Sequence, residues 1–143
     1  TGENEGLSTN KTMIGQRFQT GHVLIGKTIT RFDAELRKAG SPTGVLQARI
    51  INSSNTLKLA MGTLDIATLT TELVTHTFEN TDGYVLADGD RIIFYWPDGD
   101  GSNVPIWEMC LPPCDEAYTN GSYYLSGSWV ERTREFTMSV WGY

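Results

Sequence analysis

The sequence predicts an all-β protein, an antiparallel β-sandwich of jelly-roll type with about nine short strands. Three observations support this class of fold. Short segments in which apolar and polar side chains alternate recur along the whole chain. No window of about 11 or more residues places its apolar side chains on one helical stripe. Clusters of Gly, Asp, Asn, Ser and Pro separate the alternating segments, as expected of turns between strands.

The alternation is clearest in residues 28–38, where Phe32, Ala34 and Leu36 share one side and charged residues occupy the other. One apolar and one polar side per strand is typical of antiparallel sheets, because such sheets cover one face and leave the other in water. The predicted strands are, in order, residues 13–20, 28–38, 45–52, 57–61, 73–79, 91–96, 104–110, 122–126 and 133–141.

Turn signals lie between these strands. A single helical turn is expected within residues 65–72, where Asp65 can cap the first backbone N–H groups. The dipeptide Asn120-Gly121 is a preferred sequence for a two-residue hairpin. Three further dipeptides predict tight turns, because Asp and Gly both tolerate turn conformations: Asp82-Gly83, Asp88-Gly89 and Asp98-Gly99.

The length of 143 residues suits one domain with a single core. We divide the chain into an N-terminal arm, residues 1–12, and one sandwich domain, residues 13–143. The arm is polar and lacks periodicity, so we expect it to be flexible or to order against a neighbouring subunit. The chain starts at Thr1 without an initiator methionine, which indicates a removed leader or a start inside a longer chain.

Composition and charge disfavour several classes of partner. Hydrophobic residues make up 39% of the chain, which is more than a disordered chain carries. The net charge of −6 disfavours nucleic acid and anionic membrane surfaces, because their phosphates would be repelled. No apolar run approaches the roughly 18 residues of a membrane-spanning helix. We therefore expect no nucleic-acid partner and no membrane span.

Cys110 and Cys114 are the two cysteines, in the segment Cys-Leu-Pro-Pro-Cys. A zinc site would need two further ligands, and neither a second cysteine pair nor a nearby histidine supplies them. We predict a local disulfide that closes a proline-stiffened loop and stabilises the fold by about 2 kcal/mol. Such a bond implies an oxidising compartment. The alternative is a pair of reduced, half-buried thiols.

Three Asn-x-Ser/Thr sequons, at Asn10, Asn52 and Asn120, are candidate glycosylation sites. Each lies in a segment that also has the composition of a loop. The sequons agree with the cysteines in predicting an extracellular protein or one on a cell or virion surface.

Three stretches carry a family resemblance: residues 24–44 (LIGKTITRFDAELRKAGSPTG), 62–71 (GTLDIATLTT) and 88–95 (DGDRIIFY). Together they resemble a jelly-roll module of predicted archaeal and bacterial cell-surface proteins and of some viral tail or fibre proteins. The resemblance extends over residues 18–141 and implies a surface-exposed β-sandwich similar in shape to carbohydrate-binding modules. It implies no activity, because it carries no catalytic residues. Residues 40–44 within it are expected to form a turn between two antiparallel strands.

The segment DGDGSN, which begins at Asp98, is a candidate calcium site. Oxygen ligands at Asp98, Asp100 and Ser102, with glycine at the bend, are similar to the start of an EF-hand loop. The twelfth position of such a loop holds Met109, with Glu108 beside it, and no helical pattern flanks the segment. A structural Ca²⁺ is one hypothesis and a solvated acidic turn is the other. No other cofactor is expected.

All four tryptophans fall in the last third of the chain, together with several tyrosines. Sugars stack C–H groups on aromatic rings and bond their hydroxyls to polar side chains, so this region is a candidate glycan site. Its ligand-binding residues would be Trp107, Tyr123, Tyr124 and Glu108. The alternatives are core and subunit-interface roles. Trp96 is in phase with apolar core positions, whereas Trp141 is out of phase and should face the opposite side.

No catalytic motif is recognisable. His22 and His76 are isolated in the sequence, and no nucleophile elbow, zinc-peptidase motif or phosphate-binding loop is present. A catalytic pair of carboxylates would be invisible in sequence. The candidates alternate outward or lie in loops, as solubilising charges do: Asp33, Glu35, Glu108, Glu131 and Glu135. We therefore expect a protein that is not an enzyme.

Two functions remain as hypotheses. The first is a non-catalytic, exported structural or adhesive subunit of a surface assembly, such as a filament, fibre or coat. It would self-associate, or bind other surface proteins, through the N-terminal arm or through outward apolar side chains. The candidates for these contacts are Ile51, Ile93, Tyr95 and Trp141. The second hypothesis is a carbohydrate-binding module with an aromatic platform, with or without calcium.

Overall fold

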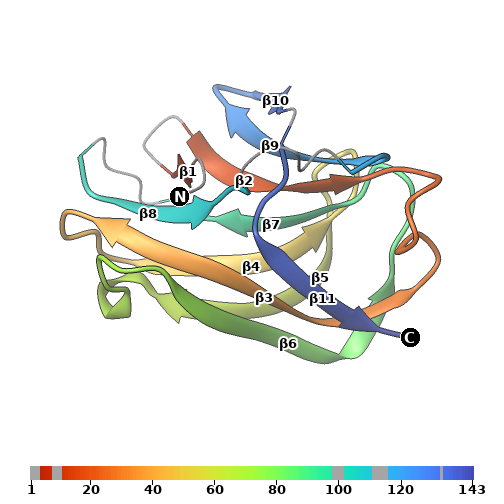
Figure 1. Ribbon diagram of the computed structural model, residues 1–143, viewed down its shortest axis with the longest axis horizontal. Coiled ribbons are helices and arrows are strands. Elements are labelled where there is room, and N and C mark those ends of the chain that lie inside the picture. The colour runs from red at the N-terminus through yellow and green to blue at the C-terminus, as the bar shows by residue number, and fades with distance from the viewer. Residues whose placement is uncertain (1–3, 8–10, 98–101, 111–115, 133) are drawn as a thin grey trace.

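The computed structural model describes residues 4–7, 11–97, 102–110, 116–132 and 134–143, and it shows two antiparallel β-sheets packed face to face (Figure 1). The predicted all-β antiparallel sandwich is therefore confirmed. The described residues form eleven strands, rather than about nine, and one short 3-10 helix, η1 (Ile66–Thr68). Within these residues no helix has the length and apolar character needed to cross a membrane.

The five-stranded sheet is organised around β3 (Thr28–Ala39), which pairs along both edges. β6 (Val74–Val85) follows one edge. The other edge is shared by β11 (Met138–Gly142), opposite the first half of β3, and β8 (Val104–Glu108), opposite its end. β1 (Asn4–Gly6) completes the sheet beside β8.

The six-stranded sheet has the order β10 (Ser128–Glu131), β9 (Thr119–Leu125), β2 (Lys11–Phe18), β7 (Arg91–Tyr95), β4 (Val45–Ile51) and β5 (Leu57–Asp65). Among the described strands, the only consecutive pairs that share a sheet are β4 with β5 and β9 with β10. Residues 40–44, expected between antiparallel neighbours, instead link β3 to β4 across the two sheets. Repeated crossings let both sheets cover one core. The jelly-roll type stays a prediction.

The core lies between the sheets and follows the alternation seen in the sequence. Phe32, Ala34 and Leu36 of β3 are buried, while the charged residues between them are only partly buried. At the centre, the rings of Phe94 and Trp107 meet edge to face with centroids 4.7 Å apart. Aromatic pairs favour this geometry, so the rings add directional contacts to the hydrophobic effect.

The expected helical turn is present as η1. Asp65 is its N-cap residue, and Asp65 Oδ1 accepts a hydrogen bond from the backbone N–H of Ala67 at 3.0 Å. This bond satisfies one of the N–H groups that a helix start leaves unpaired. Ile66 and Leu69 are buried and attach the turn to the core.

The hairpin predicted at Asn120-Gly121 is wrong, because both residues lie inside β9 and pair with β2. Asn120 is held in the strand by a contact across the sheet, where its Oδ1 accepts from Arg17 Nη2 at 2.8 Å. The hairpin between β9 and β10 is at Ser126-Gly127 instead. These two residues have positive φ angles of 49° and 93°, the backbone that a tight two-residue hairpin requires.

The two remaining described turn predictions have different outcomes. Asp82-Gly83 lies within β6 rather than between strands, which corrects the prediction. Gly83 has a φ of 70°, and the pairing of β6 with β3 shifts register nearby, as at a β-bulge. Asp88-Gly89 is a turn as predicted, closed by a bond from Ala87 N–H to Asp90 Oδ2. Asp98-Gly99 lies outside the described residues.

The expected N-terminal arm is partly incorporated into the sandwich. Residues 4–6 form β1, and β2 begins at Lys11. Leu7 is 1% exposed and its backbone N–H donates to Pro105 O at 3.1 Å. These residues therefore correct the expectation of a flexible arm over residues 1–12.

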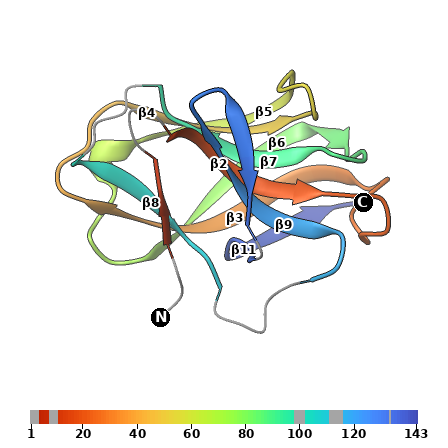
Figure 2. The same cartoon turned by 90° about the horizontal axis from the view of Figure 1, so that it is seen from above.

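Seen from above (Figure 2), the C-terminus lies at the end of the sandwich away from β1 and β8.

Candidate functional site

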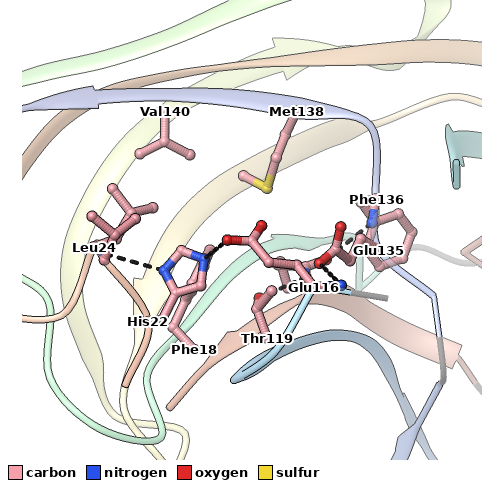
Figure 3. Close-up of a pocket in the computed structure, with 11 residues that line it drawn as sticks. Phe18, His22, Leu24, Glu116, Thr119, Glu135, Phe136, Met138 and Val140 are labelled. Atoms are coloured by element: carbon pink, nitrogen blue, oxygen red, sulfur yellow. Dashed lines mark hydrogen bonds and ion pairs between the residues drawn. The ribbon is translucent and has the colours of Figure 1, made fainter. Parts of the chain in front are cut away.

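A pocket of about 270 Å³ opens between the two sheets where β11 passes β2 and β9. The turn that follows β2 covers one side of it, and the segment that leads into β9 covers another (Figure 3). Its lining residues are Gln16, Phe18, His22, Val23, Leu24, Glu116, Thr119, Glu135, Phe136, Met138 and Val140. They come from segments far apart in the sequence, so the pocket exists only in the folded chain.

Gln16 and Thr119 form the buried polar part of the pocket. Gln16 Nε2 donates to Thr119 Oγ1 at 2.7 Å, and that hydroxyl donates to the backbone O of Arg17 at 2.7 Å. Gln16 Oε1 accepts from the backbone N–H of Phe136 at 2.9 Å. The bonds join β2, β9 and the approach to β11, so these groups are already paired and serve the fold.

His22 is a buried residue with both ring nitrogens engaged. Nδ1 accepts from the backbone N–H of Leu24 at 3.1 Å, while Nε2 lies 3.1 Å from Glu116 Oε1. The Leu24 N–H requires a lone pair on Nδ1, so the proton of a neutral ring sits on Nε2 and points to Glu116. The ring also meets Phe18 edge to face at 5.0 Å. His22 therefore shapes the turn after β2.

Glu116 and Glu135 make the rim of the pocket acidic. Glu135 Oε1 accepts from the backbone N–H of Glu116 at 2.9 Å, and the Glu116 side chain is 58% exposed. Among the described lining residues none is a lysine or an arginine. The opposite wall carries apolar side chains, including Met138 and Val140. An apolar side chain with a cationic tip would suit this combination.

A second hollow of about 370 Å³ continues along β11 and shares Val23, Leu24 and Val140 with the first. Its other lining residues are Lys27, Ile29, Trp141, Gly142 and Tyr143. We call the two hollows together the β11 groove. β11 pairs with β3 along one edge, and no described strand pairs with its other edge. Unpaired strand edges can accept another strand.

The outer side of the β11 groove carries exposed apolar side chains. Val23 is 70% exposed, Trp141 43% and Tyr143 79%. Trp141 lies on the face of β11 opposite the core, as the sequence predicted, and the guanidinium of Arg31 stacks 4.2 Å from its ring centroid. All three residues line the second hollow, and Figure 1 shows β11 running to the end of the sandwich marked C.

The outer face of the five-stranded sheet holds a carboxyl pair. A side-chain hydrogen bond with Glu108, partial burial and repulsion by Glu108 raise the pKa of Glu35. Nearby, Arg31 Nη2 lies 3.1 Å from Asp33 Oδ2, and this contact lowers the pKa of Asp33. Glu35 and Glu108 therefore act as a hydrogen-bonded carboxyl pair.

The outer face of the six-stranded sheet holds an aromatic and arginine cluster. Arg91 forms an ion pair with Glu131 and stacks 4.1 Å from the ring centroid of Trp129. Burial lowers the pKa of Arg91, although Glu131 opposes this effect. Trp129 meets Tyr124 edge to face at 5.3 Å, and Trp129 Nε1 donates to Asn55 Oδ1 at 2.7 Å. We call these five side chains the Trp129 cluster.

The predicted sugar site is not assembled. Trp107 is 0% exposed, so its ring is unavailable to a ligand, and this prediction is wrong. Its Nε1 donates to Thr137 O inside the sandwich at 3.0 Å. Tyr123 packs against the core, Tyr124 belongs to the Trp129 cluster, and Glu108 lies on the other sheet. Strand alternation separates the adjacent tyrosines, because successive side chains face opposite sides.

Two of the residues expected to make outward subunit contacts are buried. Ile51 is 1% exposed and Ile93 0%, which corrects their assignment. Ile93 lies opposite Gly15 in the neighbouring strand, where the missing side chain leaves room for it. Tyr95 is partly buried beneath Arg49, at 4.7 Å from its ring centroid to the guanidinium carbon.

The predicted calcium site is largely outside the described residues. Asp98 and Asp100 lie there, and Ser102 is exposed. The described part of the chain contains no group of three or more His, Cys, Asp or Glu residues suited to a metal ion. The calcium hypothesis stays a prediction.

The predicted disulfide involves a residue that is not described, Cys114. Cys110 follows β8, and its backbone N–H donates to Glu135 O at 2.9 Å. The bond between Cys110 and Cys114 stays a prediction.

The three sequons differ in their surroundings. Asn10 lies outside the described residues. Asn52 follows β4, and its Oδ1 accepts from the backbone N–H groups of Ser54 and Thr56, both at 2.9 Å. Asn120 lies within β9, where its Nδ2 donates to Gly121 O at 2.9 Å and to Glu131 Oε2 at 3.1 Å. The amide that a glycan would modify is therefore engaged at Asn120.

The sequence did not identify the β11 groove. His22 is an isolated histidine in the sequence, and its partner Glu116 is distant in the chain. For Glu135 the sequence predicts only a solubilising charge. No local pattern links these three residues, because the sheet topology alone brings them together.

Comparison of the chain with protein-family models, with curated proteins and with solved structures identified no match.

Proposed function

We propose that this protein is a non-catalytic structural or adhesive subunit of an exported surface assembly, such as a filament, fibre or coat. The observation that carries the proposal is the β11 groove, where exposed apolar side chains lie beside a strand edge that pairs with none of the described strands. Both features are costly in water and become favourable when another chain covers them. The partner we propose is a second copy of the chain.

The surroundings of the groove support a contact role rather than catalysis. Gln16 and Thr119 are bonded to each other and to backbone groups. His22 Nδ1 accepts the Leu24 N–H, so the ring is not arranged to take a proton from a substrate at that atom. Because these polar groups are already paired, they hold the walls of the groove in place, as a contact surface requires.

The proposed location is extracellular or on a cell or virion surface. The cysteine pair and the sequons support it, since disulfides persist in oxidising compartments. Of the two described sequons, Asn52 is the better candidate for a glycan, because the side chain of Asn120 is engaged within β9.

The proposal is tested by measuring the assembly state of the purified chain by light scattering and negative-stain microscopy over a range of concentrations. Ordered polymers or closed oligomers are the expected result. A clean monomer at every concentration would overturn self-assembly.

A charged substitution then tests the groove itself. Val23→Glu places a carboxylate beside the acidic rim and should raise the concentration needed for assembly. Leu57→Glu is the matched control, because Leu57 is an exposed apolar residue, 47% accessible, on an edge strand of the other sheet. Equal effects of the two variants would argue against the groove as the contact.

Glycan binding is a second candidate function, and the Trp129 cluster is the observation that favours it. The cluster combines aromatic rings with an arginine, a carboxylate and an amide on one sheet face. These are the groups that sugar recognition uses. A glycan array with and without calcium tests it, with Trp129→Ala expected to abolish retention and Trp141→Ala expected to leave it unchanged.

A further inference from the structure

β1 is the first described strand, and its place in the fold is set by a distant part of the chain. It pairs with β8 in the register Glu5 with Trp107 and Gly6 with Ile106. The next strand, β2, belongs to the opposite sheet, so β1 has no hairpin connection within its own sheet. β1 therefore sits on the outermost edge of the five-stranded sheet, attached through β8.

A single apolar side chain anchors this segment. Leu7, directly after β1, is 1% exposed and belongs to the core. Its backbone N–H continues the pairing by donating to Pro105 O at 3.1 Å. Backbone bonds along an edge combined with one side chain in a pocket are the features of recognition by strand addition.

Among the described residues, two features make up the site that receives β1. They are the β8 edge and the core position that Leu7 fills. With β1 removed, that edge would be unpaired and the core would hold a leucine-sized cavity. The receiving site is thus unfavourable when empty.

We propose that in the assembled state β1 and Leu7 of one copy occupy the β8 edge of the next copy. This inference rests on the proposed function and adds a second contact between copies to the one at the β11 groove. An exchanged strand makes the same contacts between copies as within one, so this second contact needs no new surface. Because each copy passes its strand to the next copy and receives one from the copy before it, the contact is head-to-tail and can extend into a filament.

A double cysteine variant, Gly6→Cys with Ile106→Cys, tests the exchange in the full chain. The two residues face each other in the register, and the Leu7 bond to Pro105 makes theirs a non-hydrogen-bonded pair. Side chains approach most closely at such pairs. A side chain added at Gly6 begins 3.6 Å from Cγ1 of Ile106. Under mild oxidation the cysteines should bond whichever copy supplies β1.

The products are read on a non-reducing denaturing gel after polymers have formed. Exchange predicts a ladder of covalently linked copies that collapses to one band on reduction. Polymers that yield only internally bonded single chains would overturn the exchange and leave the proposed function standing. A wild-type chain that never assembles would overturn both. Ile106→Cys alone is the matched control, and its failure to give a ladder excludes bonding through the native cysteines.

A second variant tests the anchor. Leu7→Asp should abolish polymers, because a carboxylate cannot occupy the core position in either copy. Leu57→Asp, at an exposed leucine, should leave polymers intact. Polymers that survive Leu7→Asp unchanged would contradict the exchange.

Discussion

Gly15 and Ile93 face each other across β2 and β7, and Ile93 occupies the space that a side chain at Gly15 would fill. A Cβ atom at Gly15 would collide with Ile93 Cγ2 and with the carbonyl oxygen of Ile92, and it would lie 2.8 Å from Ile93 Cα. Ile93 is 0% exposed although it lies on the outer face of its sheet. Two of these atoms belong to the backbone of β7, so they cannot move aside without disturbing the strand.

Gly15→Ala should therefore lower the free energy of unfolding by about 1–3 kcal/mol, the usual cost of overpacking. Chemical denaturation measures it. Gly6→Ala is the control, because its added carbon would meet neighbours at 3.4 Å or more, an ordinary contact distance. We expect Gly6→Ala to change the free energy by less than about 0.5 kcal/mol. Equal stability of both variants would contradict the packing described.

Trp107→Ala should destabilise the fold rather than affect a ligand. The ring stacks on Phe136 at 4.2 Å and meets Phe94, and its Nε1 bonds to Thr137 O. Removing it leaves a cavity and an unpaired carbonyl, for a loss of about 3–5 kcal/mol in urea unfolding. Trp141→Ala, at an exposed tryptophan, should cost less than about 1 kcal/mol. A large loss of unfolding free energy for Trp141→Ala and none for Trp107→Ala would contradict the assignment of Trp107 to the core and Trp141 to the surface.

Glu131→Gln should destabilise the Trp129 cluster. The Arg91 side chain is only 7% exposed, and Glu131 is its charge partner while also lying 3.6 Å from Arg17. Without that carboxylate the two arginines repel each other and Arg91 stays desolvated. We expect a loss of about 1–3 kcal/mol, measured by denaturation at low salt. Glu72→Gln, at an exposed residue, is the control and should leave the free energy of unfolding unchanged.

The Glu35–Glu108 pair should make stability fall as pH rises. The folded state raises the pKa of Glu35 above its ordinary 4.5, so it binds the shared proton more tightly than the unfolded chain. The stabilisation is complete below about 4.5 and is lost as pH rises through the raised pKa.

Glu35→Gln tests this pH dependence, because an amide keeps the hydrogen bond to Glu108 without the charge. As pH rises from about 3 to 8, the free energy of unfolding of the variant should increase relative to that of the wild type. Denaturation at each pH measures the difference. Parallel profiles for the two proteins would contradict a shared proton.

The strands were largely predictable because their signal is local. Phe32, Ala34 and Leu36 alternate with charged residues, and water on one side of a sheet enforces that alternation wherever the strand pairs. The Asp65 cap of η1 and the core position of Trp96, which is 1% exposed, follow from the same short-range patterns. Strands β1 and β10 were missed, because three or four residues are too few to show a period.

The sequence by itself determined the fold class, most strands and the turn at Asp88-Gly89, since neighbours along the chain specify these features. Only the tertiary structure decided that Trp107 is core, that Ile93 is covered, and that His22 meets Glu116. Each of these depends on which strand lies alongside, and that partner is far away in the sequence. Burial is a property of cross-strand packing, which no local pattern contains.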